Sequence, residues 1–313
     1  MSFTAEVKTE ICKNELLACC KKAQLASLLQ MCSTLTLSDQ LWHLQINSQN
    51  PTVAKRILAM MKQLYKVDTQ LSMIKQIKFN KRYNYEIKVF NDARLILEDL
   101  TLWGSEGLNH HPLAKLVKKD CCCRAYLAGA FLAGGSVNSP RSSNYHWEIN
   151  CQESELADFV TKLLVRYEIN TKKILRRNKN IIYLKLSEKI GDFLRLVGAY
   201  ESLMKFEDAR IQRDYMNSIS RLDNCDIANE MKAQASAARQ FADIELLVKH
   251  HGSENIETRL WEVGELRLAN PEVSYNELCL LFERKHPQGI SKSGMRHRFN
   301  KIHELANRIR NNS

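Results

Sequence analysis

The sequence predicts an α+β fold made of two related halves, followed by a helical connector and an all-α tail. The first observation is a weak internal repeat: the run at 25–33 returns at 127–135, shifted by 102 positions. The second is that alternating and helix-period apolar patterns recur at this offset. The third is that residues after 253 show only helical periodicity, interrupted by turn signals.

The most apolar segment, 126–138, reads YLAGAFLAGGSVN. It is too short to span a bilayer, so we expect a buried helix. We expect Gly134 and Gly135 to end it, since glycine takes positive φ without strain. Small residues let another backbone come close, so the weaker copy at 25–33 is the expected partner. The two halves would then pack about a pseudo-twofold axis.

Each half is expected to follow the order helix, helix, strand, helix, strand, strand, helix. Alternation of apolar residues indicates the strands, and a period of about 3.6 residues indicates the helices. The expected segments of the first half are helices at 3–12, 24–35, 50–67 and 93–103 and strands at 41–46, 71–79 and 83–89. Those of the second half are a helix from 126 to the double glycine at 134–135, helices at 153–169 and 189–200, and strands at 145–149, 171–175 and 181–186.

Composition indicates a globular protein, because 44% of the 313 residues are hydrophobic and 26% are charged. The opening MSFTAEVKTEICK contains Glu6 and no long apolar core, so we expect no signal peptide. No apolar run is long enough for a membrane span. The formal net charge of +11 favours a polyanionic partner, nucleic acid before an anionic membrane surface. We therefore expect a cytoplasmic protein with neither a membrane partner nor a small-molecule substrate.

Ten cysteines occur, and several are adjacent in sequence, at 19–20 and at 121–123. Without a secretory signal we expect reduced thiols that mostly fill the core. Cys121 and Cys123 together with His110 and His111 could be offered as a metal cluster, but their spacing matches no common zinc pattern. The sequence therefore predicts no bound metal and no cofactor.

A connector follows the two halves and has a helical composition. The stretch from Phe206 to His250 contains neither proline nor glycine and is rich in charged and amide residues. We expect two helices here, broken near Asp223 and Asn224. The predicted domains are a first half at 1–103, a second half at 104–205, a connector at 206–253 and a tail domain at 254–313.

The tail indicates two short helices, a turn and a third helix, which is the order of a helix-turn-helix. The expected helices lie at 256–269, 275–282 and about 291–309. Pro271 ends the first, because the residue before proline resists the helical conformation. Ser274 and Glu277, three residues apart, form a capping box for the second. Ser291 or Ser293 is expected to cap the third.

The last segment is strongly basic, since 284–313 contains eight Lys or Arg residues against one acidic residue, Glu304. Side chains of the types found at the start of the last helix contact phosphates and base edges. We predict that it binds double-stranded DNA through Ser291, Lys292, Ser293, Arg296, His297, Arg298 and Lys301. The leading candidates among these are Arg296, Arg298 and Lys292. The alternative is an ordinary solvated basic face.

Basic residues also gather in the predicted hairpins of both halves. They are Lys75, Lys78, Lys81, Arg82 and Lys88 in the first half and Lys172, Lys173, Arg176, Arg177, Lys179 and Lys185 in the second. An exposed basic sheet could follow a duplex backbone, so we predict a secondary DNA-binding surface. The alternative is that hairpin tips are polar and that lysines protect sheet edges from aggregation.

The two short runs of the repeat resemble the LAGLIDADG motif of homing endonucleases. Together with the segments YLAGAFLAGGSVNSP, NSISRLDNCDIAN and ISKSGMRHRFNKIHELA, they make nearly the whole chain similar to the WhiA family of bacterial DNA-binding regulators. The resemblance implies a saddle-shaped αββαββα-type fold in each half, with a fourth strand within 34–46 in the first half and within 137–149 in the second. It also implies that the tail supplies specific recognition.

The function that this resemblance implies is sequence-specific DNA binding by a transcriptional regulator. It implies roles in the cell cycle, namely cell division and chromosome segregation, with sporulation in some lineages. The protein would lie in the cytoplasm, associated with the nucleoid. A sigma factor or RNA polymerase is a candidate protein partner.

In LAGLIDADG nucleases an acidic residue near the end of each motif helix binds a divalent metal. Letter-by-letter alignment puts these acids at Cys32 and Gly134, which are degenerate metal positions because neither offers the oxygen ligand that magnesium prefers. We therefore predict a DNA-binding protein that is not an enzyme. Two alternatives stay open: an interaction scaffold that binds DNA only non-specifically, and a metal-dependent DNA endonuclease.

Overall fold

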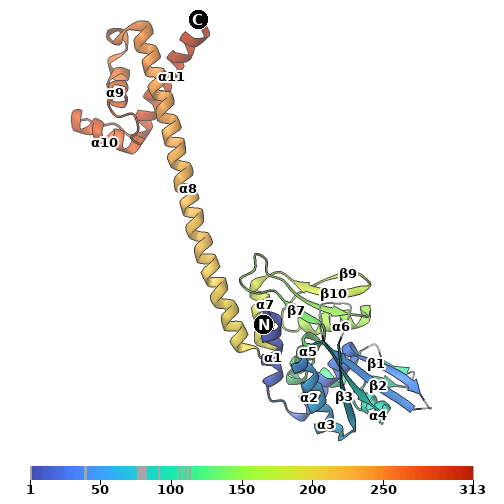
Figure 1. Ribbon diagram of the computed structural model, residues 1–313. Coiled ribbons are helices and arrows are strands. Elements are labelled where there is room, and N and C mark those ends of the chain that lie inside the picture. The colour runs from blue at the N-terminus through green and yellow to red at the C-terminus, as the bar shows by residue number, and fades with distance from the viewer. Residues whose placement is uncertain are drawn as a thin grey trace. The chain divides into compact units, whose positions relative to one another are not determined.

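The structure, a computed structural model, describes residues 2–38, 41–75, 83–90, 92–105, 107–109, 111–112 and 114–312 (Figure 1). The chain forms two compact units, Met1–Arg213 and Asp214–Ser313. The first contains helices and antiparallel sheets, and the second is helical. The α+β fold class predicted from the sequence is therefore confirmed. No helix within the described ranges is long and apolar enough to cross a bilayer.

The first unit contains the repeated order of elements. After α1 (Phe3–Lys13), the first half comprises α2 (Ala18–Cys32), β1 (Ser33–Ser38), β2 (Leu41–Ser48), α3 (Pro51–Tyr65), β3 (Thr69–Lys75), β4 (Tyr83–Val89) and α4 (Ala93–Asp99). A linking segment holds β5 (Trp103–Gly104), β6 (Gly107–Leu108) and η1 (Ala114–Val117). The second half comprises α5 (Asp120–Gly134), β7 (Gly135–Val137), β8 (Trp147–Cys151), α6 (Ser154–Val165), β9 (Lys172–Arg176), β10 (Lys179–Leu184) and α7 (Ser187–Leu196). Each half has the four strands that the family resemblance implies.

Each half builds one antiparallel sheet, in the order β1-β2-β4-β3 or β7-β8-β10-β9. Paired residues of neighbouring strands face the same side of a sheet. The pair Ile46–Ile87 in the first sheet and the pair Ile149–Ile182 in the second are buried. These apolar faces contact α3 and α6, respectively. The opposite faces are mostly polar, as at the pair Gln45–Lys88 in the first sheet, although Ile174 and Ile181 pair on that face of the second.

The two halves meet where the repeated small-residue runs predicted a close contact. Helices α2 and α5 lie side by side, and a β-carbon added at Gly129 would come within 2.6 Å of the Gln24 carbonyl oxygen. Across the same contact, the Tyr126 hydroxyl donates to Gln30 Oε1 over 2.9 Å. Glycine and other small residues lower the stability of an isolated helix, but at this contact they allow α2 and α5 to pack closely.

Helix α5 ends at Gly134 as expected, but not for the predicted reason. Gly135 has φ −83°, an ordinary extended conformation. Both glycines instead lie in crowded places: a β-carbon at Gly134 would meet the Asn150 carbonyl oxygen, and one at Gly135 would meet the ring of Phe131. Close packing, rather than positive φ, therefore explains the double glycine.

The connector is one helix, so the predicted break near Asp223 and Asn224 is wrong. Helix α8 runs without interruption over Tyr200–His251 (Figure 1). Aspartate and asparagine each lower helix propensity by only some tenths of a kcal/mol, and no glycine or proline interrupts the segment. The predicted helix at 189–200 ends earlier, at Leu196, because Gly198 adopts φ +75° before α8 begins.

The second unit is built from η2 (Ser253–Asn255), α9 (Thr258–Ala269), α10 (Tyr275–Lys285), α11 (Lys292–Asn312) and the end of α8. The predicted capping box of Ser274 and Glu277 is present. Ser291 starts the last helix, because its hydroxyl accepts the Gly294 backbone N–H over 3.1 Å. The core contains Ile244, Leu247, Leu260, Val263, Leu266, Leu278, Phe282, Met295, Phe299, Ile302, Ala306 and Ile309.

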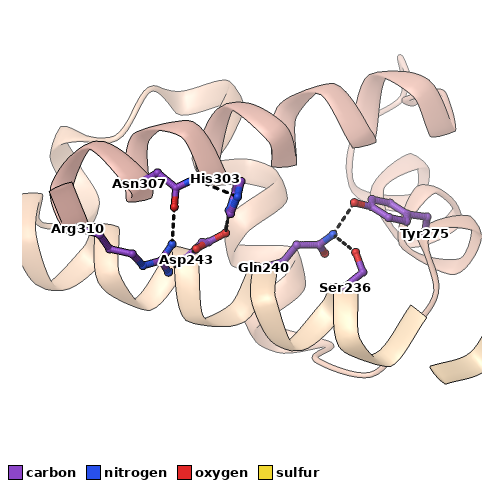
Figure 2. A network of polar contacts seen from close by, with 7 residues as sticks. All are labelled: Ser236, Gln240, Asp243, Tyr275, His303, Asn307 and Arg310. Atoms are coloured by element: carbon purple, nitrogen blue, oxygen red, sulfur yellow. Dashed lines mark hydrogen bonds and ion pairs between the residues drawn. The ribbon is translucent and has the colours of Figure 1, made fainter. Parts of the chain in front are cut away.

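Hydrogen bonds and ion pairs connect the end of α8 to the other helices of this unit (Figure 2). Asp243 is only 1% exposed and pairs with His303 Nδ1 and with the Arg310 guanidinium, each over 2.6 Å. One turn earlier, the Gln240 amide donates to the Tyr275 hydroxyl over 2.5 Å. These contacts and the burial of Ile244 and Leu247 make the end of α8 a fourth packing helix, which sequence reasoning did not predict.

Candidate nucleic-acid interface

Helix α11 has one buried face and one solvent-facing basic face. Met295, Phe299 and Ile302 lie in the core of the second unit. Because residues three and four apart share a helix face, the positions between them point outward. The exposed side chains at the start of α11 include all but one of the predicted DNA contacts: Ser291, Lys292, Ser293, Arg296, His297 and Lys301.

Arg298 is the exception. Its guanidinium donates to the Arg259 carbonyl oxygen over 3.0 Å and pairs with Glu262 over 3.2 Å. It also lies 5.3 Å from the centre of the Phe282 ring. Arg298 therefore ties α11 to α9 and α10, and we no longer place it among the leading DNA contacts.

Asn300 is a polar residue of this face that sequence reasoning missed. It is exposed and lies four residues after Arg296. Residues four apart on a helix are neighbours on one side, so this spacing was a signal that could have found it. An asparagine amide can bond the N6 and N7 edge of adenine.

The turn before α11 gives the unit its helix-turn-helix geometry. Helix α10 ends at Lys285, and the turn contains Gly289 with φ +61°, a left-handed conformation that suits glycine. Helices α10 and α11 contact each other. The exposed start of α11 therefore follows a short turn from a packed supporting helix, as in DNA-binding proteins of this class.

The second sheet offers a further basic surface on its polar face. Strand pairing sets Lys172 beside Tyr183 and Arg176 beside Lys179, so these side chains share that face. Arg177 and Asn178 form the two-residue turn, with φ of 51° and 56°. Direct pairing of Arg176 with Lys179 places like charges opposite each other, which costs stability.

Lys173 lies on the other face of that sheet. Its ammonium bonds Asp158 over 2.6 Å and the Ser154 hydroxyl over 2.8 Å. Both partners belong to α6, which covers the apolar face. Lys173 therefore joins the strand to the helix, and the prediction that it belongs to one surface with Lys172 and Arg176 was wrong.

The basic residues of the first hairpin are described only in part. Lys78, Lys81 and Arg82 lie outside the described residues. Lys75 ends β3 opposite Tyr83 in the register, and its side chain is not described. Lys88 is described, and it pairs with the nearly buried Glu86 over 2.9 Å.

The two positions that hold metal-binding acids in nucleases are unsuited to that task. At Gly134 a β-carbon would meet the Asn150 carbonyl oxygen and, at 2.9 Å, the Met31 methyl, so a carboxylate side chain would need backbone movement. At Cys32, burial raises the pKa of the thiol to about 11. The nearby Lys8 is cationic at neutral pH, and burial lowers its pKa to about 8. The residues present do not fit a magnesium site.

The cysteines assemble differently from the grouping considered for the sequence. Cys121 lies with Cys19, Cys20 and Cys122, whose sulfur atoms are all within 4.8 Å of one another. Cys123 is buried away from this group, and His111 stacks on Phe159 with ring centres 4.7 Å apart. His110 lies outside the described residues.

Comparison with known proteins extends over the whole chain. Family models match in three parts: the WhiA N-terminal LAGLIDADG-like domain at residues 18–103, the WhiA LAGLIDADG-like domain at 123–216 and the WhiA C-terminal HTH domain at 219–306. A Brevibacillus brevis protein named "Probable cell division protein WhiA" is 40% identical over 313 residues, covering 99% of this chain and 98% of its own. The chain belongs to the WhiA family.

Other WhiA proteins also match nearly the whole chain or a large part of it. The Staphylococcus aureus (strain USA300) protein of the same name is 39% identical over 311 residues, with 99% of this chain and 98% of its own covered. The crystal structure of full-length DUF199/WhiA from Thermatoga maritima superposes with a TM-score of 0.60 at 25% identity, covering 98% of this chain and 99% of that one. A structure of the N-terminal LAGLIDADG domain of DUF199/WhiA gives 0.51 at 24% identity, covering 63% and 90%. The WhiA family fold therefore spans both units of the chain.

Proposed function

We propose that this WhiA-family protein is a sequence-specific DNA-binding regulator of transcription. The observation that carries the proposal is the solvent-facing start of α11, where basic, hydroxyl and amide side chains follow a helix-turn-helix turn. Its relatives are named for cell division, so we place its target genes in cell division and chromosome segregation, and in sporulation where a lineage sporulates. Its site of action would be the nucleoid in the cytoplasm.

The geometry suggests roles for several side chains of this face. A recognition helix enters the major groove with its N-terminal residues against base edges. Arg296 would bond guanine O6 and N7, and Asn300 would bond adenine. Lys292 and Lys301 would contact phosphates, and the helix start at Ser291 would receive a phosphate on backbone N–H groups of the first turn.

The polar face of the second sheet supports a secondary, sequence-independent contact. Arg176 and Lys179 repel each other in the free protein. A phosphate backbone laid across Lys172, Arg176 and Lys179 would relieve that repulsion. This surface would add affinity and salt dependence without reading bases.

We also propose that the protein has no endonuclease activity. Two-metal phosphodiester cleavage needs oxygen ligands that hold divalent ions against both oxygens of the reacting phosphate. Position 134 has no room for a carboxylate, and position 32 offers a thiol beside a lysine. Purified protein should leave duplex DNA intact in magnesium, and specific magnesium-dependent cleavage would overturn this part.

The test of DNA recognition is binding of the full chain to a library of genomic fragments. We expect enrichment of a defined sequence, and Arg296→Ala should lower its affinity for that sequence about 5- to 150-fold, as for loss of a good base contact. Arg239→Ala is the matched control, since Arg239 is an exposed arginine on α8 in the same unit. Equal binding of all fragments by the wild type would instead favour the non-specific scaffold, and unchanged affinity of Arg296→Ala would contradict the proposed site.

A further inference from the structure

We propose that Cys19, Cys20, Cys121 and Cys122 bind one zinc-class ion as thiolates, in a site that joins the two halves of the first unit. The four sulfur atoms lie within 4.8 Å of one another. We call these residues the four-thiol cluster. The proposal is independent of DNA binding, because the cluster belongs to the first unit and shares no residue with α11.

The spacing of the sulfur atoms fits tetrahedral coordination. A zinc–sulfur distance of about 2.3 Å puts the sulfurs of a tetrahedral site about 3.8 Å apart. Within each adjacent pair, Cys19–Cys20 and Cys121–Cys122, the sulfurs are 3.9 Å apart. The remaining separations reach at most 4.8 Å, so side-chain rotation of less than about 1 Å per sulfur would close the tetrahedron.

The internal repeat explains how two separate cysteine pairs meet. Cys121 lies 102 positions after Cys19, and Cys122 lies the same distance after Cys20, which is the offset of the repeat. Each pair occupies the first turn of its helix, α2 or α5, and these two helices form the contact between the halves. The cluster therefore takes two ligands from each half, across the contact between α2 and α5.

The surroundings suit the negative charge of a tetrathiolate site. Neither α2 nor α5 has a side-chain N-cap hydrogen bond, and the start of a helix favours anions. Thiolate ligands select zinc-class ions over magnesium and calcium, which take oxygen ligands.

An entry route for the ion is also present. Cys121 is exposed and Cys19 is half-buried. An open cavity of about 470 Å³ is bordered by Cys20 and Cys121, and its other lining residues include Arg124 and Leu17. An ion can therefore reach the cluster without unfolding of the helix pair.

The experiment is metal analysis of the full chain, purified with a non-thiol reductant. We expect about one zinc per chain, and exchange with cobalt should give the intense visible absorption of a tetrahedral thiolate complex. The double variant Cys19→Ser/Cys121→Ser should lose both signals. Cys225→Ser, which changes an exposed cysteine on α8 outside the cluster, should retain both.

The outcomes separate this proposal from ordinary reduced thiols. A chelator should lower the melting temperature of the wild type and of Cys225→Ser, because an ion bound only by the folded state stabilises it. Wild-type protein that contains no zinc and shows no cobalt bands would overturn the proposal. This measurement is made on the wild type, so it stands even if the double variant does not fold. Disulfides within the cluster in place of bound metal, or full metal retention by the double variant, would also overturn it.

Discussion

Gly129 lies at a close contact between α2 and α5, and its missing side chain is what permits that contact. A β-carbon there would stand 2.6 Å from the Gln24 carbonyl oxygen and 3.0 Å from Ser27 Cβ. Because the first neighbour is backbone, no rotamer change can relieve the clash. We expect Gly129→Ala to lower the free energy of unfolding of the first unit by about 1–3 kcal/mol, the usual cost of overpacking. Urea unfolding of the full chain measures this.

Gly264 on α9 is the matched control. A β-carbon there would have its nearest neighbour at 3.5 Å, an ordinary contact with Ile244. Alanine is the better helix former by about 0.5–1 kcal/mol, so Gly264→Ala should leave the stability of the second unit equal or higher. Equal destabilisation by both substitutions would contradict the close helix contact.

Lys8 gives a pH dependence whose sign follows from its burial. Burial lowers its pKa from 10.5 to about 8 in the folded protein. Between pH 8 and 10.5 the unfolded chain binds more protons than the folded one, so the contribution of Lys8 to stability rises with pH in that window. Below pH 8 the charged, half-buried ammonium destabilises the fold.

Lys8→Met removes this ammonium. We expect the variant to be more stable than the wild type by about 1–2 kcal/mol at neutral pH, and the difference to vanish as pH approaches 10.5. Urea unfolding of both proteins across this range is the measurement. A stability gain that persists at high pH would show that the cause is packing and not the charge.

Arg296 and Arg298 show which property of a single residue the sequence does not predict, namely whether its side chain is exposed or engaged by a neighbouring helix. Both are arginines at the start of one helix, and residue type made both candidates. The position of Glu262 on the neighbouring α9 then engages Arg298 and leaves Arg296 exposed. Only the tertiary arrangement of α9 distinguishes them, whereas local signals such as the Ser274–Glu277 capping box were readable directly.

At the scale of elements, the end of α8 works as part of the DNA-binding bundle. It supplies Ile244 and Leu247 to the core and the buried Asp243 to an ion-pair network with α11. We expect a fragment of residues 236–313 to fold cooperatively. A fragment of residues 254–313, the predicted tail domain, should be largely unfolded because it exposes that core and leaves His303 and Arg310 without Asp243.

Circular dichroism during thermal unfolding distinguishes the two fragments. In the longer one, Asp243→Ala should lower the free energy of unfolding by about 1–3 kcal/mol, because two charge-assisted hydrogen bonds are lost while the half-exposed His303 and Arg310 can be solvated. A shorter fragment that unfolds as cooperatively as the longer one would contradict the role assigned to α8.

The polar face of the second sheet makes its own prediction. We expect replacement of Lys172, Arg176 and Lys179 by alanine to flatten the salt dependence of DNA binding. The slope of the logarithm of the binding constant against the logarithm of the salt concentration should fall in magnitude by up to about 0.9 for each lost phosphate contact. The preferred sequence should not change. Lys173→Ala should leave that dependence unchanged, because its ammonium is held by Asp158. Binding titrations at several salt concentrations measure both, and equal effects would contradict the assignment of faces.

Helices and strands were predicted correctly where neighbouring residues determine them, and incorrectly where contacts with distant parts of the chain do. Repeated apolar patterns located most helices and strands of both halves. The first strand of each half follows its motif helix directly, at Ser33 and Gly135, so no loop separates the strand from the helix. The break in α8 was predicted from residue type, but no helix-breaking residue is present, and its packing in the second unit depends on helices distant in sequence.

At the scale of the whole molecule, the internal repeat determines where candidate sites lie as well as how the two halves fold. It places the degenerate positions Cys32 and Gly134 at the equivalent ends of the two motif helices, and at the opposite ends of the same helices it brings together the four-thiol cluster. Applying the offset of 102 to the cysteines would have found this cluster from the sequence. Searching for a zinc pattern within one segment could not, because the ligands come from two.

The central claim is that specific recognition resides in the second unit, in α11. The most direct test is footprinting of the full chain and of the 236–313 fragment on the same genomic fragments at two salt concentrations. We predict that both protect the same sequence, with the fragment binding more weakly and with a smaller salt dependence because it lacks the basic sheet. A sequence-specific footprint from the full chain, with none from the folded fragment at any concentration, would contradict the account.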